Sequence, residues 1–285
     1  KTSTVVNILC MKIYLGKNKA LRPLIAVADS RRKFPGRGCF DSRRKQYSLS
    51  FRYFYRMKTI GLVGGLTWYS SIDYYRFINQ KVNERLVGDE SARVIIKSVN
   101  YGEIKKLTQT GDWKGIFAII AEAAQKTEAA GADCLLLGAN TMHHIAEEVA
   151  AVIHIPLIHI ADVVAKAIRE KNITTVALLG TKYTMLFDFY KKRLAAAGIR
   201  TLLPGEQDIE IINKGIYEEL GKGILLPATK EKYLAIISKL VRQGAEGVIL
   251  GCTEIPLLIK QEDSPVTVFD TTLLHATAAV DFALG

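Results

Sequence analysis

The sequence has few cysteines and no long apolar run. Its 285 residues include four cysteines, Cys10, Cys39, Cys134 and Cys252, and none of them belongs to a C-x-x-C pair. This spacing speaks against a disulfide framework and indicates reduced thiols in a cytosol-like compartment. No apolar stretch approaches the roughly 20 residues that a membrane-spanning helix needs. We therefore expect a cytoplasmic protein without a membrane partner.

Sequence motifs for metals and nucleotides are also missing. There is no H-E-x-x-H pattern, and the adjacent His143 and His144 would point in different directions from a helix. The glycine-rich residues 61–71, GLVGGLTWYSS, match neither the dinucleotide nor the P-loop pattern. The sequence predicts no metal site and no nucleotide site.

Acidic residues are nearly absent from the first 56 positions. Residues 1–56 hold 14 of the 39 Lys and Arg but only 2 of the 28 Asp and Glu, which leaves 25 basic and 26 acidic residues in 57–285. The net charge of +11 is therefore carried by the N-terminal segment.

Three interpretations of residues 1–56 follow, in order of preference. The segment is untranslated upstream sequence or a cloning artefact with Met57 as the true start, an organellar presequence, or a basic nucleic-acid arm. No folded basic face accompanies it, so we expect no nucleic-acid partner. We expect residues 1–56 to lie outside the fold.

From Met57 onward, apolar strand-like runs alternate with amphipathic stretches of helical length. This alternation predicts an α/β fold with parallel strands and right-handed crossovers. The predicted strands are residues 59–65, 93–100, 134–140, 156–162, 175–181, 201–205, 247–253 and 265–271.

The second half of this region repeats the first. Three pairs of stretches match in the same order: residues 59–65 with 175–181, 131–141 with 244–254, and 156–162 with 265–271. The repeat predicts two similar doubly wound parallel-sheet units, related by pseudo-two-fold symmetry.

The repeat also predicts the domains. We expect the first α/β domain to comprise residues 57–157 and 267–285, and the second to comprise residues 158–266. Ligands of open α/β sheets bind beyond the carboxyl ends of the strands. Two facing units would therefore enclose an active site in the cleft between them.

Cys252 is the strongest candidate for chemistry. It follows the apolar run VILG, residues 248–251, where a helix is expected to begin. Backbone N–H groups and the helix dipole stabilise a thiolate there, so we expect a thiol pKa below about 8.5. The alternative is a small buried apolar residue. The repeat aligns Ala139 with Cys252, so the two should approach one ligand from opposite sides.

Polar side chains near the strand ends are candidates for substrate binding. Asn140 and Thr141 follow one strand end, and Thr253 follows Cys252. Such groups can hydrogen-bond a carboxylate that also meets free N–H groups, although plain helix capping is the alternative. Ser70 and Ser71, after a glycine turn, would suit a small anion in the same way.

Residues 57–285 resemble the aspartate/glutamate racemase family. The resemblance rests on motifs in sequence order: MKTIGLVGG (57–65), TWYSS (67–71), NTMH (140–143), HIAD (159–162), GTKYTM (180–185), GCTE (251–254) and FDT (269–271). It implies cofactor-independent racemisation in which two facing α/β domains each offer a cysteine to one face of the substrate's Cα. It also implies a homodimer.

The resemblance assigns roles to individual positions. Cys252 corresponds to the second catalytic cysteine, and the polar side chains near the strand ends hold the α-carboxylate and amine region. Lys214, by itself a surface cation on a predicted helix, falls where relatives carry a cation for the side-chain carboxylate. Residues 97–104 lack the arginine that some aspartate-specific relatives have there. Preference for aspartate or glutamate would therefore depend mainly on Lys214.

Ala139 departs from the family pattern, because the usual first cysteine is missing. Cys134 cannot replace it, since it lies five residues earlier, about 16 Å along the strand and on the other face. A natural loss and an engineered replacement would give the same sequence. A positioned acid or base contributes about 10²–10⁴-fold, so proton return to one face of Cα should be slow.

The sequence therefore predicts an amino-acid racemase that acts on aspartate or glutamate, with Cys252 as its remaining thiol base. One alternative is a single-cysteine decarboxylase of malonate type, in which CO₂ leaves from the face opposite the thiol. Another is a catalytically impaired binder of acidic amino acids.

Overall fold

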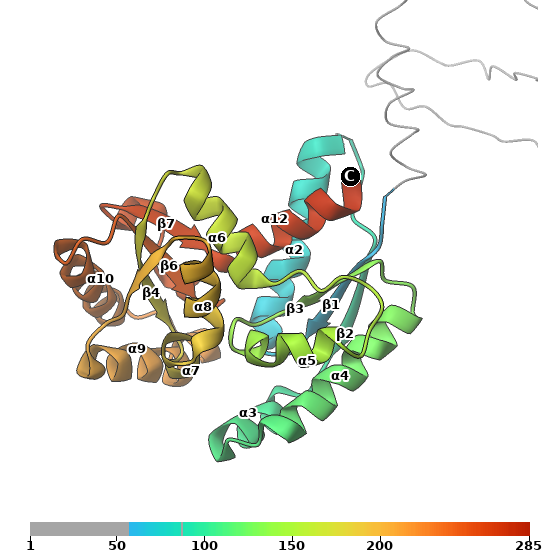
Figure 1. Cartoon of the computed structure of the whole chain (residues 1–285), viewed down its shortest axis with the longest axis horizontal. Helices are drawn as coiled ribbons and strands as arrows, with labels where there is room; N and C mark the ends of the chain where they lie inside the picture. Colours follow the sequence, from blue (N-terminus) through green and yellow to red (C-terminus); the bar gives the residue numbers. More distant parts are fainter. Residues whose placement is uncertain (1–56, 87) are drawn as a thin grey trace, which may run out of the picture. The chain divides into compact units, whose positions relative to one another are not determined.

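The computed structural model describes residues 57–86 and 88–285, which belong to one compact unit (Figure 1). The interpretations of residues 1–56 lie outside the described residues. No helix in the described part of the chain is long and apolar enough to cross a bilayer.

The first half of the described chain forms a three-stranded parallel sheet of order β2-β1-β3. Its strands are β1 (Ile60–Gly64), β2 (Val94–Ser98) and β3 (Cys134–Leu137). Its helical segments are α2 (Trp68–Leu86), α3 (Tyr101–Thr110), α4 (Trp113–Ala129), η1 (Thr141–Ile145) and α5 (Ala146–Ala150).

The second half forms a four-stranded parallel sheet of order β5-β4-β6-β7. Its strands are β4 (Thr175–Gly180), β5 (Arg200–Leu202), β6 (Gly247–Gly251) and β7 (Thr267–Asp270). The helical segments are α6 (Ile160–Glu170), α7 (Lys182–Leu186), α8 (Asp188–Ala196), α9 (Glu206–Glu218), η2 (Leu220–Lys222), α10 (Pro227–Arg242), α11 (Ile255–Leu258), η3 (Gln261–Asp263) and α12 (Thr271–Leu284).

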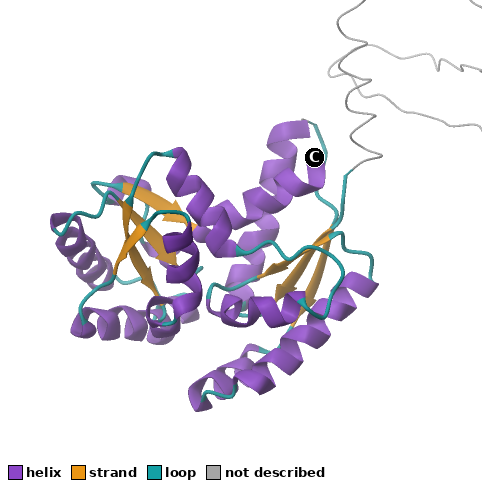
Figure 2. Ribbon diagram, in the orientation of Figure 1, coloured by secondary structure: helices purple, strands orange, loops and turns teal. Residues whose placement is uncertain are grey.

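Helices cover both faces of each sheet (Figure 2). In β3, Leu135 and Leu137 belong to the core that includes α4, whereas Leu136 belongs to the core that includes α2 and α12. Successive side chains of a strand point to opposite faces, so a strand that is apolar throughout is buried on both sides. This is the doubly wound arrangement that the sequence predicts.

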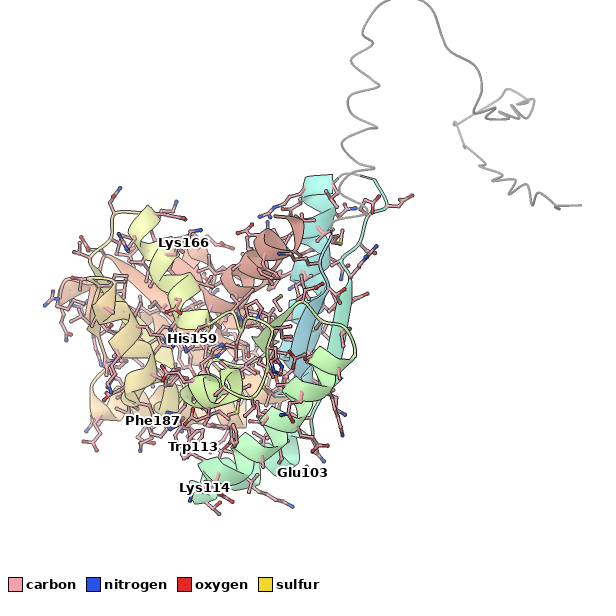
Figure 3. The ribbon with its side chains drawn as sticks, turned by 45° about the vertical axis from the view of Figure 1, so that its right-hand side comes forward. Glu103, Trp113, Lys114, His159, Lys166 and Phe187 are labelled. Atoms are coloured by element: carbon pink, nitrogen blue, oxygen red, sulfur yellow. The ribbon has the colours of Figure 1, made fainter. Side chains whose placement is uncertain are left out.

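The two sheets share one topology, which confirms the internal repeat. Val248 of β6 pairs with Val268 of β7, and the corresponding Leu135 of β3 forms a parallel bridge with Leu157. The predicted strand 156–162 is reduced to this one bridge. The reason is that α6 begins at Ile160, where His159 caps the helix (Figure 3).

One predicted domain boundary is wrong. Residues 267–270 were expected in the first domain, but they form β7 beside β6 in the second sheet. Only after this strand does the chain return to the first half, as α12. There His275 Nδ1 lies 2.7 Å from the Tyr74 hydroxyl of α2, within hydrogen-bond distance. The strand belongs with β6 because it completes the parallel ladder there. The rest of the predicted division remains a prediction.

Candidate active site

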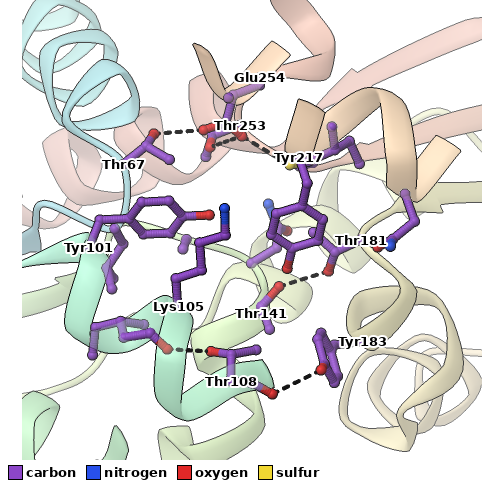
Figure 4. Close-up of a pocket in the computed structure, with 18 of the residues that line it drawn as sticks. Thr67, Tyr101, Lys105, Thr108, Thr141, Thr181, Tyr183, Tyr217, Thr253 and Glu254 are labelled. Atoms are coloured by element: carbon purple, nitrogen blue, oxygen red, sulfur yellow. Dashed lines mark hydrogen bonds between the residues drawn. The ribbon is translucent and has the colours of Figure 1, made fainter. Parts of the chain in front are cut away.

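A cavity of about 440 Å³ lies among residues from both halves of the described chain (Figure 4). Its lining includes residues that closely follow the carboxyl ends of four strands: Leu66 after β1, Ala139 after β3, Thr181 after β4 and Cys252 after β6. This is where an open parallel sheet binds its ligands.

Two glycines set the path of the backbone at this site. A Cβ atom on Gly138 would lie 3.0 Å from the Val63 carbonyl oxygen, and one on Gly251 would lie 2.9 Å from the Leu179 carbonyl oxygen. Both contacts are too close for a side chain to fit without movement of the neighbouring strand. Glycine therefore lets the chain pass the adjacent strand end and place the next residue against the cavity.

Cys252 is held by a buried carboxylate. Its Sγ donates to Glu254 Oε2 over 2.9 Å, and the Thr253 hydroxyl donates to the same oxygen over 2.8 Å. From the other half of the chain, the Thr67 hydroxyl donates to Glu254 Oε1 over 2.6 Å. Glu254 is only 4% exposed, so these donors replace water around its charge.

The predicted low pKa of the Cys252 thiol is wrong. Burial raises the pKa of the thiol well above its usual value, and the charge of Glu254 and its hydrogen bond raise it further. The backbone N–H groups of Thr253 and Glu254 lower the pKa, as expected for a strand end, but they are outweighed. The thiol is therefore protonated.

The Ala139 side of the cavity carries no acidic or basic side chain at the position matching Cys252. Ala139 packs against the apolar cluster that includes Leu66 and Met142. Next to it, Asn140 Nδ2 donates to the Thr271 hydroxyl over 3.0 Å. Within the described residues the buried Asn140 Oδ1 has no hydrogen-bond partner, so it can accept one from a ligand.

Three hydroxyl groups form a cluster between the two halves. Thr141 Oγ1 lies 2.9 Å from Thr181 Oγ1 and 3.2 Å from Thr184 Oγ1, and the last two are 3.1 Å apart. Thr141 and Thr181 both line the cavity. Five of the residues predicted from the sequence line the cavity: Ala139, Asn140, Thr141, Cys252 and Thr253.

Ser70 and Ser71 do not line the cavity, which corrects their predicted role. Helix α2 begins at Trp68, before the two serines, and the Ser70 N–H in its first turn donates to the Thr67 hydroxyl. Ser70 Oγ donates to the carbonyls of Thr67 and Gly138, while Ser71 Oγ accepts from the Gly65 N–H at 2.8 Å. Both serines hold the loop between β1 and α2.

Lys214 is also outside the cavity. Its side chain is 72% exposed and lies 3.8 Å from Glu218, one turn further along α9. Lys214 thus lies on the surface, as its sequence context alone suggested. We therefore no longer assign binding of the substrate's side-chain carboxylate to Lys214.

Helix α3 supplies lining residues that sequence reasoning missed. Tyr101, Ile104, Lys105 and Thr108 line the cavity at intervals of three and four residues, which places them on one helical face. The signal in the sequence is this periodicity, which begins inside the stretch 97–104 and continues to Thr108. From α9, Tyr217 lines the same space.

The tyrosines of the wall stay protonated. Burial raises the pKa of Tyr101 to about 12, with an added contribution from the charge of Glu254. Burial likewise raises the pKa of Tyr217. Both phenols therefore act as neutral hydrogen-bond groups near the thiol.

His143 is a buried structural residue. Its Nδ1 lies 3.0 Å from the Ala139 carbonyl oxygen, and its ring is 4.7 Å from that of His159. Burial, then the neighbouring His159 and His275, lower the pKa of His143 well below its usual value, so the ring is neutral. No group of three His, Cys, Asp or Glu suited to a metal occurs in residues 57–86 and 88–285.

Comparison with known proteins gives one family. The family model described as Asp/Glu/hydantoin racemase matches residues 63–279. A solved structure from Yersinia pestis, assigned to the Asp/Glu racemases, is 44% identical with a TM-score of 0.76, over 80% of this chain and 100% of its own. An aspartate racemase homologue from Pyrococcus horikoshii is 37% identical with a TM-score of 0.71, over 80% and 99%.

A sequence relative extends the comparison. The broad-specificity amino-acid racemase RacX of Bacillus subtilis is 23% identical over 173 residues, which are 58% of this chain and 71% of that protein. The matched regions include the strand ends that carry Ala139 and Cys252. The chain therefore belongs to the Asp/Glu/hydantoin racemase family.

Proposed function

We propose that the protein is a cofactor-independent amino-acid racemase that prefers aspartate or glutamate, with Cys252 as the group that removes the α-proton. The observation that carries this proposal is the contact of 2.9 Å between Cys252 Sγ and Glu254 Oε2 inside a cavity lined from both halves of the chain. A thiol beside a buried carboxylate has a base that can take its proton.

The first step follows from the charges of the site. Glu254 Oε2 takes the proton from Cys252, and the cationic α-ammonium group of the substrate stabilises the new thiolate. Asn140 Oδ1, which is buried and free to accept, supports binding of that ammonium group. The thiolate then removes the α-proton, and the electron pair passes into the α-carboxylate.

The intermediate carries extra charge on its carboxylate oxygens. The hydroxyls of Thr141 and Thr181 line the cavity and can donate to these oxygens. Return of a proton from Cys252 restores the starting enantiomer. Delivery from the Ala139 side gives the opposite enantiomer, and there we assign the Thr141 hydroxyl, which gives its proton to Cα. Glu254 releases to solvent the proton that it took from Cys252, and a solvent proton passed through Thr181 and Thr184 restores the Thr141 hydroxyl.

Exchange of the α-proton in D₂O, followed by NMR, tests the proposal. L- and D-aspartate and L- and D-glutamate are each incubated with the protein and with Cys252→Ala. We expect exchange with at least one enantiomer, and a loss of about 10²–10⁴-fold in the variant. Unchanged exchange by Cys252→Ala would show that another group removes the proton.

A second candidate reaction is favoured by the apolar surroundings of Ala139. In a decarboxylase of malonate type the bond from Cα to a carboxylate breaks, CO₂ leaves toward that apolar side, and Cys252 protonates the remaining carbanion. Release of CO₂ from substituted malonates, without exchange of any amino acid, would replace the racemase proposal. Stabilisation of the protein by aspartate or glutamate, without exchange or CO₂ release, would indicate a binding protein.

A further inference from the structure

Three lysines line the cavity, and they differ in how their charge is used. Lys182 forms an ion pair with Glu210. Lys222 lies on an exposed turn at the rim. Lys105 is half-buried, and within residues 57–86 and 88–285 no carboxylate forms an ion pair with it. Among these three lysines, Lys105 is therefore the half-buried one whose charge has no carboxylate partner in the described residues.

Figure 4 shows the side chain of Lys105 rising from α3 into the cavity, toward the space between Tyr101 and Tyr217. Its Nζ lies 6.0 Å from the centre of the Tyr217 ring. The two rings confine the apolar stem and leave the ammonium group facing the cavity. A cation held this way loses little freedom when an anion binds.

We propose that Lys105 binds the side-chain carboxylate of an acidic amino-acid substrate and so determines its selection over neutral analogues. This inference rests on the proposed function, because it takes the cavity as the substrate site. It transfers to α3 the role that the sequence had suggested for Lys214.

The position of Lys105 is fixed at both ends of α3. At the start, the Asn100 side chain accepts from the Gly102 N–H over 2.9 Å and caps the helix. Near the end, the Tyr183 hydroxyl donates to the Thr108 carbonyl oxygen over 2.9 Å, which ties α3 to the second half of the chain. The cation is therefore presented from a held helix, with Tyr101 one turn before it.

Charge also orients the substrate. Glu254, beside the reacting thiol, would repel a second carboxylate, and its oxygens already accept three donors. A negative side chain is therefore directed away from Glu254 and toward Lys105. An ammonium group on a flexible stem tolerates carboxylates at different distances better than a planar guanidinium does. We thus expect selection of acids over amides, with little discrimination between aspartate and glutamate.

The experiment compares Lys105→Met with Lys106→Met as the matched control, since Lys106 is exposed on the same helix and does not line the cavity. The substrates are aspartate and glutamate, with the nearly isosteric asparagine and glutamine. In Lys105→Met we expect kcat/KM for the acids to fall on the order of 10–100-fold, mainly through KM, with no fall for the amides. Lys106→Met should match the unaltered protein.

Two results would overturn the inference. One is an unchanged acid-to-amide ratio in Lys105→Met; the other is a loss of acid preference in Lys222→Met instead. Calorimetric binding of aspartate and asparagine to the same proteins gives a readout that needs no turnover. If the unaltered protein exchanges no α-proton but still binds aspartate through Lys105, the proposed reaction fails while this inference stands. If aspartate binds Lys105→Met as tightly as the unaltered protein, this inference is wrong and the proposed reaction is not affected.

Discussion

Cys252 and Ala139 occupy corresponding strand ends, but only one of them can carry a proton. The thiol is buried beside the Glu254 carboxylate, and its pKa is raised by burial and by that charge. The thiol therefore holds its proton. Under the proposed function, the positive charge of a substrate amino group would favour the thiolate, so binding and activation of the base would be linked through the same electrostatics.

Replacement of Ala139 by cysteine should restore the second acid. In Ala139→Cys we expect the ratio of inversion to α-proton exchange to rise on the order of 10²–10⁴-fold, because a positioned thiol would face the side of Cα opposite Cys252. Chiral chromatography and NMR exchange, run on the same samples, measure this ratio.

Ala139→Ser serves as the control for that variant, since a hydroxyl of similar size is a much weaker acid and should give a smaller gain. If Ala139→Cys folds and exchanges protons from Cys252 but inverts no faster, the corresponding strand ends do not face opposite sides of the substrate. The proposed path through the hydroxyl cluster would then have to be judged separately.

Residues close to a strand end could be predicted from the sequence, whereas residues on a helix face could not. Cys252, Ala139 and Asn140 were found because parallel strands gather their ends at one edge. Lys105 was missed because its inward direction depends on where α3 lies relative to the second half of the chain, to which the Tyr183 hydroxyl ties it, and the periodicity of α3 alone does not show which face is inward. Lys214 failed for the same reason, since only packing decides which face of α9 meets the cavity.

At the scale of elements, α6 and α12 begin with corresponding caps made of different chemistry. His159 Nδ1 accepts from the Ala161 N–H, and Asp270 accepts from the N–H groups of Thr272 and Leu273. A histidine can cap in this way only while it is neutral. Burial and, after it, the charge of Arg193 lower the pKa of His159 to about 4, while Asp162 opposes the shift.

The cap of α6 should make stability depend on pH. Because the folded pKa lies below the unfolded value of about 6.5, the unfolded chain binds more protons, so stability falls as the pH drops from about 6.5 toward about 4. We expect His159→Asn, which caps without titrating, to remove about 1–3 kcal/mol of that loss. Urea unfolding at pH 7.5 and 4.5 measures the difference.

His154→Asn is the control, because its side chain is 96% exposed. It removes a histidine ring without touching the cap of α6. His143 and His275 also have lowered pKa values through burial, so part of the acid loss persists in His159→Asn. An identical pH dependence with and without His159 would show that the cap is not the titrating element.

The order of strands and helices was largely predictable, because apolar runs of strand length alternate with amphipathic stretches. The run 156–162 was the exception. Its residues are apolar enough for a strand, yet helix capping at His159 ended it after a single bridge. The boundary at 267 failed because composition does not reveal which sheet edge a short strand will join.

For the whole molecule, we expect residues 57–285 alone to fold and to exchange α-protons at the same rate as the full chain. The described residues form the cavity and the hydrogen bonds given above for it, and the Yersinia pestis relative is covered in full by 80% of this chain. Thermal unfolding and exchange rates of the two lengths are to be compared. A drop of more than about 5 °C in Tm, or a lost rate, would give residues 1–56 a part in the fold.

The paired glycines before Ala139 and Cys252 have a consequence for how this architecture changes over evolution. The ladder hydrogen bonds end at or before them, so the side chain that follows can be exchanged without disturbing either sheet. Duplication thus left two half-sites that can be altered separately. Under the proposed function, the half that keeps an acid would decide whether the α-carbon is inverted, relabelled in place or protonated from one side, so that Ala139→Cys alone would change the stereochemical outcome.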